Sequence, residues 1–223
     1  QDRLTGIPVR RLYCRESSRK PAHEGVKVVR IVSIVILGDT CQCGSYILHI
    51  RLKKDAKLAF GEFKKGKMIS MPSGDYIYVG SANAKRGATS LGRRLVRHAL
   101  RSGKKRHHPF RREMVGSFDE HGVGDGNLLP AGPKHCRWNV DYLLDLSAAE
   151  LMAVFVLRTD RSLEAALAEL IEADPQSQII EKELGANDKP GHTHLLRIDA
   201  GERWWSELPD RLSAHFNLEI RLS

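Results

Sequence analysis

The chain has 223 residues, a length that suits one large domain or two small ones. Its composition, 41% hydrophobic and 28% charged, is typical of a globular protein. Its formal net charge of +9 favours a polyanionic partner, and a nucleic acid more than a membrane surface. The longest apolar run, 28–37, is interrupted by Arg30 and Ser33 and is shorter than the ~18 residues of a transmembrane helix, so we expect no membrane segment.

The first half of the chain predicts mostly strands. Residues 1–40 begin as an irregular basic arm and end in a β-branched stretch, 26–37, that predicts a strand. Alternation of apolar and polar residues predicts strands at 44–52 and 74–80. Two short strands are expected between them, at 57–63 and 67–71.

The second half predicts helices and strands in alternation. Thr89 and Ser90 can cap a helix over 91–101. Residues 102–136 are rich in Gly, His, Lys and Arg and predict a long loop. The remaining elements are a helix over 138–146, a strand over 151–157, a helix over 162–173, a strand over 192–198, and a helix and a strand within 201–223. Interleaved strands and helices predict a mixed α and β class.

The positive charge is concentrated in one segment. Residues 84–112 contain eleven Lys or Arg residues, three histidines, and no Asp or Glu. A solvated helix face would normally intersperse acids with bases, so this one-sided charge favours contact with a phosphate backbone. The residues predicted to bind nucleic acid are Arg93, Arg97, Arg101, Lys104, Lys105 and Arg106. The alternative is that the helical arginines are solvated surface residues.

Arg94 and His98 are four residues apart on the predicted helix and therefore share one face. They follow two tyrosine motifs, "GSY" at 44–46 and "GDYIYVGSA" at 74–82, and lie within "RLVRH". Further on, "WNVDYLL" and "GANDKPGHTHL" complete an ordered series between residues 44 and 198. In this series the sequence resembles the GIY-YIG nuclease superfamily, and most closely a branch of it that is sometimes fused to endonuclease III-type glycosylases.

The resemblance implies an α+β fold, with a small mixed or antiparallel sheet flanked by helices over 41–200. Residues 1–40 would precede this domain as an arm with one possible strand, and 201–223 would follow it as a helix–strand extension. Two departures from the superfamily stand out: a long insertion separates the tyrosine motifs, and Ser81-Ala82 follows the second motif. Gly44 and Gly80 carry over as structural glycines.

The resemblance also implies a site. Its catalytic residues would be Tyr46, Tyr78, Arg94 and His98, and the activity would be Mg²⁺- or Mn²⁺-dependent hydrolysis of phosphodiester bonds in DNA, with RNA not excluded. A tyrosine with a pKa near ~10 can act as a base only if neighbouring cations lower that pKa. The metal-binding acid is expected to be Glu164 or Asp141, with Asp188 and His194 as a third possibility.

Two functions therefore remain open on the sequence. The chain is either a metal-dependent endonuclease, in DNA repair or mobile-element processing, or a catalytically inactive nucleic-acid-binding module with the same fold. The metal-binding acid distinguishes them.

The cysteines add a smaller question. There are four, irregularly spaced, which we interpret as reduced thiols of a cytoplasmic protein. A zinc site built from Cys41, Cys43 and histidines of 107–136 is the less favoured alternative, because no second pair of cysteines follows at zinc spacing.

Overall fold

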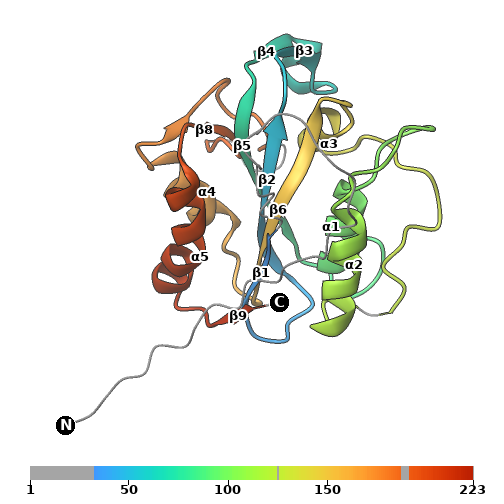
Figure 1. The fold of residues 1–223 in the computed structure, drawn as a ribbon, viewed down its shortest axis with the longest axis vertical. Helices are drawn as coiled ribbons and strands as arrows, with labels where there is room; N and C mark the ends of the chain where they lie inside the picture. The colour runs from blue at the N-terminus through green and yellow to red at the C-terminus, as the bar shows by residue number, and fades with distance from the viewer. Residues whose placement is uncertain (1–32, 125, 187–190, 223) are drawn as a thin grey trace, which may run out of the picture. The chain divides into compact units, whose positions relative to one another are not determined.

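The computed structural model describes residues 33–124, 126–186 and 191–222. A seven-stranded sheet has the order β7-β8-β5-β2-β6-β1-β9 (Figure 1). Every neighbouring pair is antiparallel except β1 and β6, which are parallel. The strands are β1 (Ser33–Gly38), β2 (Gly44–Leu52), β5 (Gly74–Ala82), β6 (Ala149–Arg158), β7 (Ser177–Gln178), β8 (Leu195–Ile198) and β9 (Ile220–Leu222). The predicted α+β class with a mixed sheet is confirmed.

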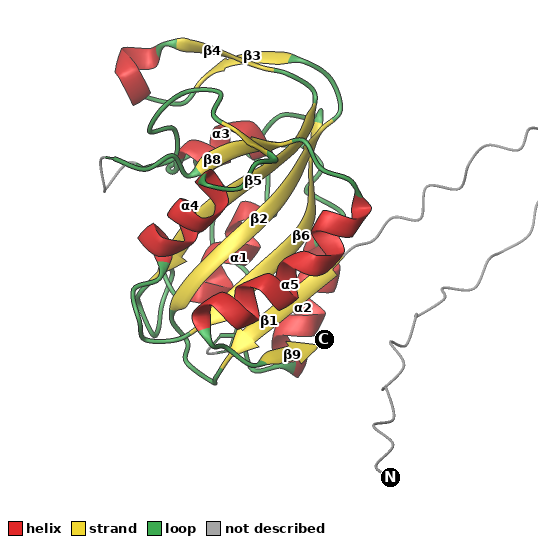
Figure 2. Cartoon of the chain, turned by 90° about the vertical axis from the view of Figure 1, so that its left-hand side faces the viewer, coloured by secondary structure: helices red, strands yellow, loops and turns green. Residues whose placement is uncertain are grey.

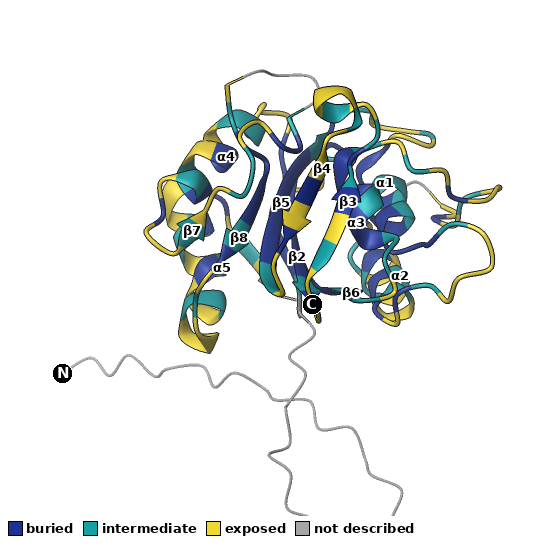
Figure 3. Cartoon of the chain, turned by 90° about the horizontal axis from the view of Figure 1, so that it is seen from above, coloured by how far each residue is buried: buried dark blue, intermediate teal, exposed yellow. Residues whose placement is uncertain are grey.

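Helices cover both faces of this sheet (Figures 1 and 2). One face carries α1 (Leu91–His98), α2 (Arg111–Glu120) and α3 (Asn139–Leu144). The opposite face carries α4 (Glu164–Glu172) and α5 (Glu202–Phe216). Figure 3 shows the central strands buried between the two layers, with exposed residues on the outer sides of α4 and α5.

Strand β2 shows why two cores form. Successive side chains of a strand point to opposite faces. Tyr46 and Leu48 belong to the hydrophobic core beneath α1, α2 and α3. Ile47 belongs to the second core, beneath α4 and α5. Because both faces are covered by helices, all but one of the residues of β2 are buried.

The insertion between the two tyrosine strands forms a separate two-stranded hairpin. Its strands are β3 (Ala56–Ala59) and β4 (Met68–Met71), which pair antiparallel. A turn of 3-10 helix, Phe63–Gly66, joins them. Both short strands are confirmed, although the first ends at Ala59 and not at residue 63.

The terminal segments contribute strands to the main sheet. β1 pairs with β6 on one side and with β9 on the other. The C-terminal helix and strand predicted within 201–223 are confirmed as α5 and β9. The strand predicted at 26–37 is found as Ser33–Gly38; its first residues, and the basic arm over 1–32, lie outside the described residues.

Two expectations for the basic segment were wrong. The predicted loop over 102–136 contains α2, whose buried side chains are only Met114 and Phe118 at i and i+4, too narrow an apolar stripe to stand out in the sequence. Helix α1 ends at His98 and not at residue 101, so Arg101 lies beyond the helix. No helix in the described part of the chain is long and apolar enough to cross a membrane.

Candidate functional site

Tyr46 and Tyr78 lie on adjacent strands and on the same face of the sheet. In the register of β2 and β5, Tyr46 is opposite Gly80 and Leu48 is opposite Tyr78, so the tyrosines are diagonal neighbours. Their ring centroids are 6.3 Å apart. A Cβ atom at Gly80 would lie 2.6 Å from the Tyr46 hydroxyl oxygen, so only glycine leaves room for the tyrosine ring.

Gly44 has a different reason for being glycine. Its φ of +153° is accompanied by a close approach of β6, since a Cβ atom there would lie 2.0 Å from the backbone oxygen of Leu157. Both glycines predicted to be structural therefore have a steric role in placing β2.

Helix α1 brings His98 onto the two tyrosines. His98 Nε2 lies 2.9 Å from the Tyr46 hydroxyl oxygen, and the His98 ring centroid is 6.2 Å from that of Tyr78. Its side chain has no solvent exposure. The helix is held in this position by Leu91 and Leu95, which are buried in the core beneath it.

Arg94, one turn earlier, is held at the rim of the same site. Its guanidinium donates a hydrogen bond to the backbone oxygen of Ser81, at the end of β5. It also lies over the ring of Trp138, 4.7 Å from the centroid, a cation–π contact. The i, i+4 spacing predicted that Arg94 and His98 would share a face, and the structure places both beside the tyrosines.

Glu164 reaches this site from the other helical layer. It begins α4, and its Oε2 accepts a hydrogen bond of 2.7 Å from the Ser81 hydroxyl. Its Oε1 lies 3.6 Å from His194 Nδ1. The register of β8 with β5 runs from Asp75 to Tyr78, and Ser81 lies beyond it, where β5 pairs with β2. Its side chain is 19% exposed.

Asp141 is also close, but it is not available to a metal. Its Oδ1 lies 3.1 Å from His98 Nδ1 and 3.0 Å from Lys134 Nζ. Its Oδ2 accepts the backbone N–H groups of Arg137 and Trp138. Both oxygens are therefore engaged by protein donors, and the side chain has no exposure. These contacts argue against Asp141 as a metal ligand, because protein groups already occupy both of its oxygens.

The other proposed ligands can now be placed. Asp188 lies outside the described residues, and His194 lies beside Glu164. Within the described ranges, no group of three or more His, Cys, Asp or Glu side chains is arranged to hold a metal ion. Cys41, Cys43 and the histidines of 107–136 lie within those ranges and form no such group.

Burial controls the protonation of the site. It raises the pKa of Tyr46, and the charge of Arg94 opposes this only in part. Burial also raises the pKa of Tyr78. It lowers the pKa of His98, against the hydrogen bond to Asp141. Burial would raise the pKa of Asp141, but His98 and the charge of Lys134 lower it overall. At neutral pH the phenols are thus protonated, His98 is neutral and Asp141 is ionised.

The predicted nucleic-acid-binding residues divide into two groups. Arg101 was wrongly expected to contact nucleic acid: it is 8% exposed and donates hydrogen bonds to the backbone oxygens of Leu144, Ala149 and Arg106. Because α1 ends before it, Arg101 turns into the protein and holds the α3–β6 connection. The residues that keep exposed surface are Arg93, Arg97, Lys104, Lys105 and Arg106.

Three residues of the site were not predicted. Trp138 supports Arg94, and Arg97 and Arg137 also lie over its ring, each 5.6 Å from the centroid. Lys134 pairs with Asp141, and Ser81 joins Arg94 to Glu164. Trp138 had a signal, since it begins the "WNVDYLL" motif. Lys134 had none, because an isolated lysine in a loop is usually exposed.

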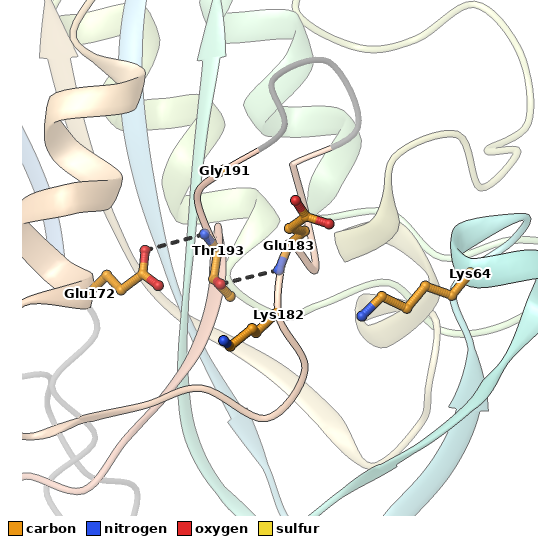
Figure 4. A pocket seen from close by; sticks show the side chains of 6 residues that line it. All are labelled: Lys64, Glu172, Lys182, Glu183, Gly191 and Thr193. Carbon is orange, nitrogen blue, oxygen red and sulfur yellow. Dashed lines mark hydrogen bonds between the residues drawn. The ribbon is translucent and has the colours of Figure 1, made fainter.

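A shallow pocket of about 440 Å³ lies elsewhere (Figure 4). Two hydrogen bonds join residues that line it: the Thr193 N–H donates to Glu172, and the Glu183 N–H donates to the Thr193 hydroxyl. It is lined by Lys64, Glu172, Lys182, Glu183, Gly191 and Thr193. None of the predicted site residues lines it.

Comparison with known proteins gives one match. Neither the curated proteins nor the solved structures contain a match to the chain. A family model described as "Domain of unknown function DUF123" matches residues 45–216, from the strand of Tyr46 to the end of α5. Because this match covers most of the chain, the protein belongs to the DUF123 family.

Proposed function

We propose that this protein is a divalent-metal-dependent endonuclease of the GIY-YIG type that hydrolyses phosphodiester bonds in DNA. The observation that carries the proposal is the convergence of two tyrosines, an arginine, a histidine and one carboxylate from four separate elements. These side chains are Tyr46 of β2, Tyr78 of β5, Arg94 and His98 of α1, and Glu164 of α4.

Each group has a role that suits phosphodiester hydrolysis. Because burial raises the pKa of Tyr46, the phenol does not act as a base by itself: it takes a proton from the attacking water only as its own hydroxyl proton passes to His98 Nε2, 2.9 Å away. The water oxygen forms a bond to phosphorus as the bond to the leaving oxygen breaks, and the leaving oxygen takes up a proton from solvent. The Arg94 guanidinium stabilises the negative charge that develops on the phosphate oxygens. Tyr78 packs against Tyr46 and His98 and orients both.

The donor set fits Mg²⁺ or Mn²⁺. Mg²⁺ is usually held by one or two carboxylates, with water and substrate phosphate oxygens in the other positions. Glu164 is partly exposed and is linked to the site through Ser81, whose hydroxyl donates to Glu164 and whose backbone oxygen accepts from Arg94. When bound, the ion would supply positive charge to the phosphate and the leaving oxygen.

The exposed basic residues suit a DNA backbone. Arg93 and Arg97 lie on the same short helix as Arg94, and Lys104 and Arg106 follow in the exposed loop after it. Phosphate contacts of this kind orient a duplex without reading its sequence. DNA is therefore the proposed partner, and affinity is expected to fall steeply with salt.

Cleavage of DNA tests the proposal. Purified protein with Mg²⁺ or Mn²⁺ is expected to cut at least one of single-stranded, duplex, flap or branched DNA. Arg94→Ala and Tyr46→Phe, which removes the hydroxyl bonded to His98, are each expected to reduce the rate roughly 10²-fold or more while leaving the fold intact. Arg203→Ala is the matched control, because this exposed arginine of α5 pairs only with Glu207 in the contacts of the described residues. Failure to cut all four substrates with either metal would refute the enzyme.

The second candidate is a catalytically inactive nucleic-acid-binding module. It is favoured by one observation: among the described residues no group of three or more His, Cys, Asp or Glu side chains is arranged to hold a metal ion, and Glu164 already accepts a hydrogen bond from Ser81. Strongly salt-dependent DNA binding without any cleavage would establish this alternative.

A further inference from the structure

We propose that Asp141 and Lys134 form a buried ion pair that fixes the proton of His98 on Nδ1, so that Nε2 is the acceptor for the Tyr46 hydroxyl proton. Asp141 and Lys134 are thus positioning residues that act through His98. The catalytic consequence rests on the proposed function, whereas the position of the proton on His98 does not.

The contacts form an unbroken series across the core. Lys134 Nζ lies 3.0 Å from Asp141 Oδ1, the same oxygen lies 3.1 Å from His98 Nδ1, and His98 Nε2 lies 2.9 Å from the Tyr46 hydroxyl oxygen. The side chains of Lys134, Asp141 and His98 have no exposure, and Tyr46 is 1% exposed. The polar atoms of Lys134, Asp141 and the His98 Nδ1 are therefore satisfied by one another and not by water.

The chemistry of a carboxylate decides the tautomer. An ionised aspartate only accepts hydrogen bonds, so the His98 nitrogen facing Asp141 must carry a proton. A neutral imidazole carries one proton in total, which leaves a lone pair on Nε2. The only hydrogen in the series that can meet this lone pair is that of the Tyr46 hydroxyl. The opposite tautomer would place a lone pair of Nδ1 against the Asp141 oxygen.

Lys134 keeps the imidazole neutral. A lone buried carboxylate would favour a second proton on His98, which would then be unable to accept one from Tyr46. Lys134 balances the Asp141 charge, and its ammonium also donates to the backbone oxygen of Leu100. The remaining groups around the imidazole are Arg94 of the same helix, Tyr78 of β5 and the ring of Trp138.

A purely structural role for Asp141 makes a different prediction. Asp141 also accepts the backbone N–H groups of Arg137 and Trp138 at the start of α3. Asp141→Asn keeps the size of the side chain and an oxygen for these bonds, but it removes the charge and adds an N–H donor. If the role were only structural, this substitution would leave the proton on His98 Nδ1.

The experiment is nitrogen NMR of the histidine side chains at pH 7.5, with His98→Gln identifying the His98 signals. The wild-type protein is expected to show His98 as the Nδ1–H tautomer. Asp141→Asn is expected to move the proton to Nε2. Asp75→Asn, which removes the carboxylate that lies 2.7 Å from His49, is the matched control and is expected to leave the His98 signals unchanged. An Nε2–H tautomer in the wild-type protein, or no change in Asp141→Asn, would overturn the inference.

Cleavage kinetics provide a second test of the proposal. Asp141→Asn is expected to lower kcat roughly 10²-fold with little change in KM, and Lys134→Met to shift the pH–rate profile upward because His98 holds its proton to higher pH. If Asp141→Asn does not fold, the double substitution with Lys134→Gln removes both charges together and is read in the same way. A protein that never cleaves DNA but shows the expected tautomers would refute the nuclease and leave the ion-pair inference standing.

Discussion

The two faces of β2 and β5 each bury a histidine against an aspartate. On the α5 side, His49 Nε2 lies 2.7 Å from Asp75 Oδ1; on the α1 side, His98 Nδ1 lies 3.1 Å from Asp141 Oδ1. Burial lowers the pKa of both histidines, and the aspartate partner opposes this in each case. The two pairs share this chemistry, although the His49–Asp75 pair keeps some solvent exposure and the His98–Asp141 pair has none.

The two Asp–His pairs differ in their other contacts. The His49 ring is stacked on Trp205 at 3.6 Å between centroids, and Arg51 also bonds to Asp75, so this pair fastens α5 to the sheet. His98 uses its other nitrogen to reach the Tyr46 hydroxyl, beside Arg94. A buried Asp–His pair is therefore a packing device in one region and part of a candidate site in the other. The two histidines differ in their next contact, which is the Trp205 ring for His49 and the Tyr46 hydroxyl for His98.

The largest expected effect compares the two histidines directly. His98→Gln is expected to reduce DNA cleavage roughly 10²–10⁴-fold, because it removes the acceptor for the Tyr46 proton. His49→Gln is expected to leave the rate within about threefold of wild type, since no group of the tyrosine site contacts His49. Initial rates at saturating DNA measure both, and equal losses in the two variants would remove the distinction between the faces.

The second prediction concerns Gly80, which leaves room for the Tyr46 ring. Gly80→Ala is expected to destabilise the protein by about 1–3 kcal/mol and to separate Tyr46 from His98, because the new methyl group would overlap the tyrosine ring. Gly116→Ala is the control: it lies in α2 with open space around it and is expected to be more stable by about 0.5–1 kcal/mol. Chemical denaturation measures both changes. Equal stability of the two variants would contradict the close approach at Gly80.

The third effect tests what the two histidines share. Each has a folded-state pKa below that of the unfolded chain, so below a pH of about 6.5 the unfolded state binds the extra proton. Stability should therefore be full above that pH and fall as pH decreases, by up to about 1.4 kcal/mol per pH unit for each histidine. Urea unfolding between pH 7.5 and 5 is expected to show this slope, reduced in both His49→Gln and His98→Gln. A slope that neither substitution reduces would mean that both rings are protonated in the fold.

The smallest effect separates exposed from buried basic residues. Lys104→Ala is expected to reduce the slope of log affinity against log salt for DNA by about 1 without loss of stability, because it removes one phosphate contact. Arg101→Ala is expected to destabilise the protein by at least about 2 kcal/mol, because buried backbone oxygens lose their donor. If Arg101→Ala instead reduced the salt slope without loss of stability, Arg101 would belong to the DNA-binding surface after all.

Local periodicity in the sequence was enough for the parts of the site that lie close together along the chain. Strand alternation placed Tyr46 and Tyr78 on regular strands, and a spacing of four residues placed Arg94 and His98 on one helix face. The mixed α and β class followed from the same patterns. These inferences succeed because a backbone period of two or 3.6 residues is a property of neighbouring residues.

Tertiary structure decided the roles of the acids and of Arg101. Asp141 reaches His98 across 43 positions, and Glu164 reaches Ser81 across 83. Asp141 is a candidate metal ligand from its place in "WNVDYLL", and nothing in the sequence around it indicates that Lys134 pairs with it in the core. Burial and charge pairing depend on which distant segments pack together. Residue type and spacing therefore proposed the carboxylates, and packing alone determined which one is filled by protein donors and which one faces the site.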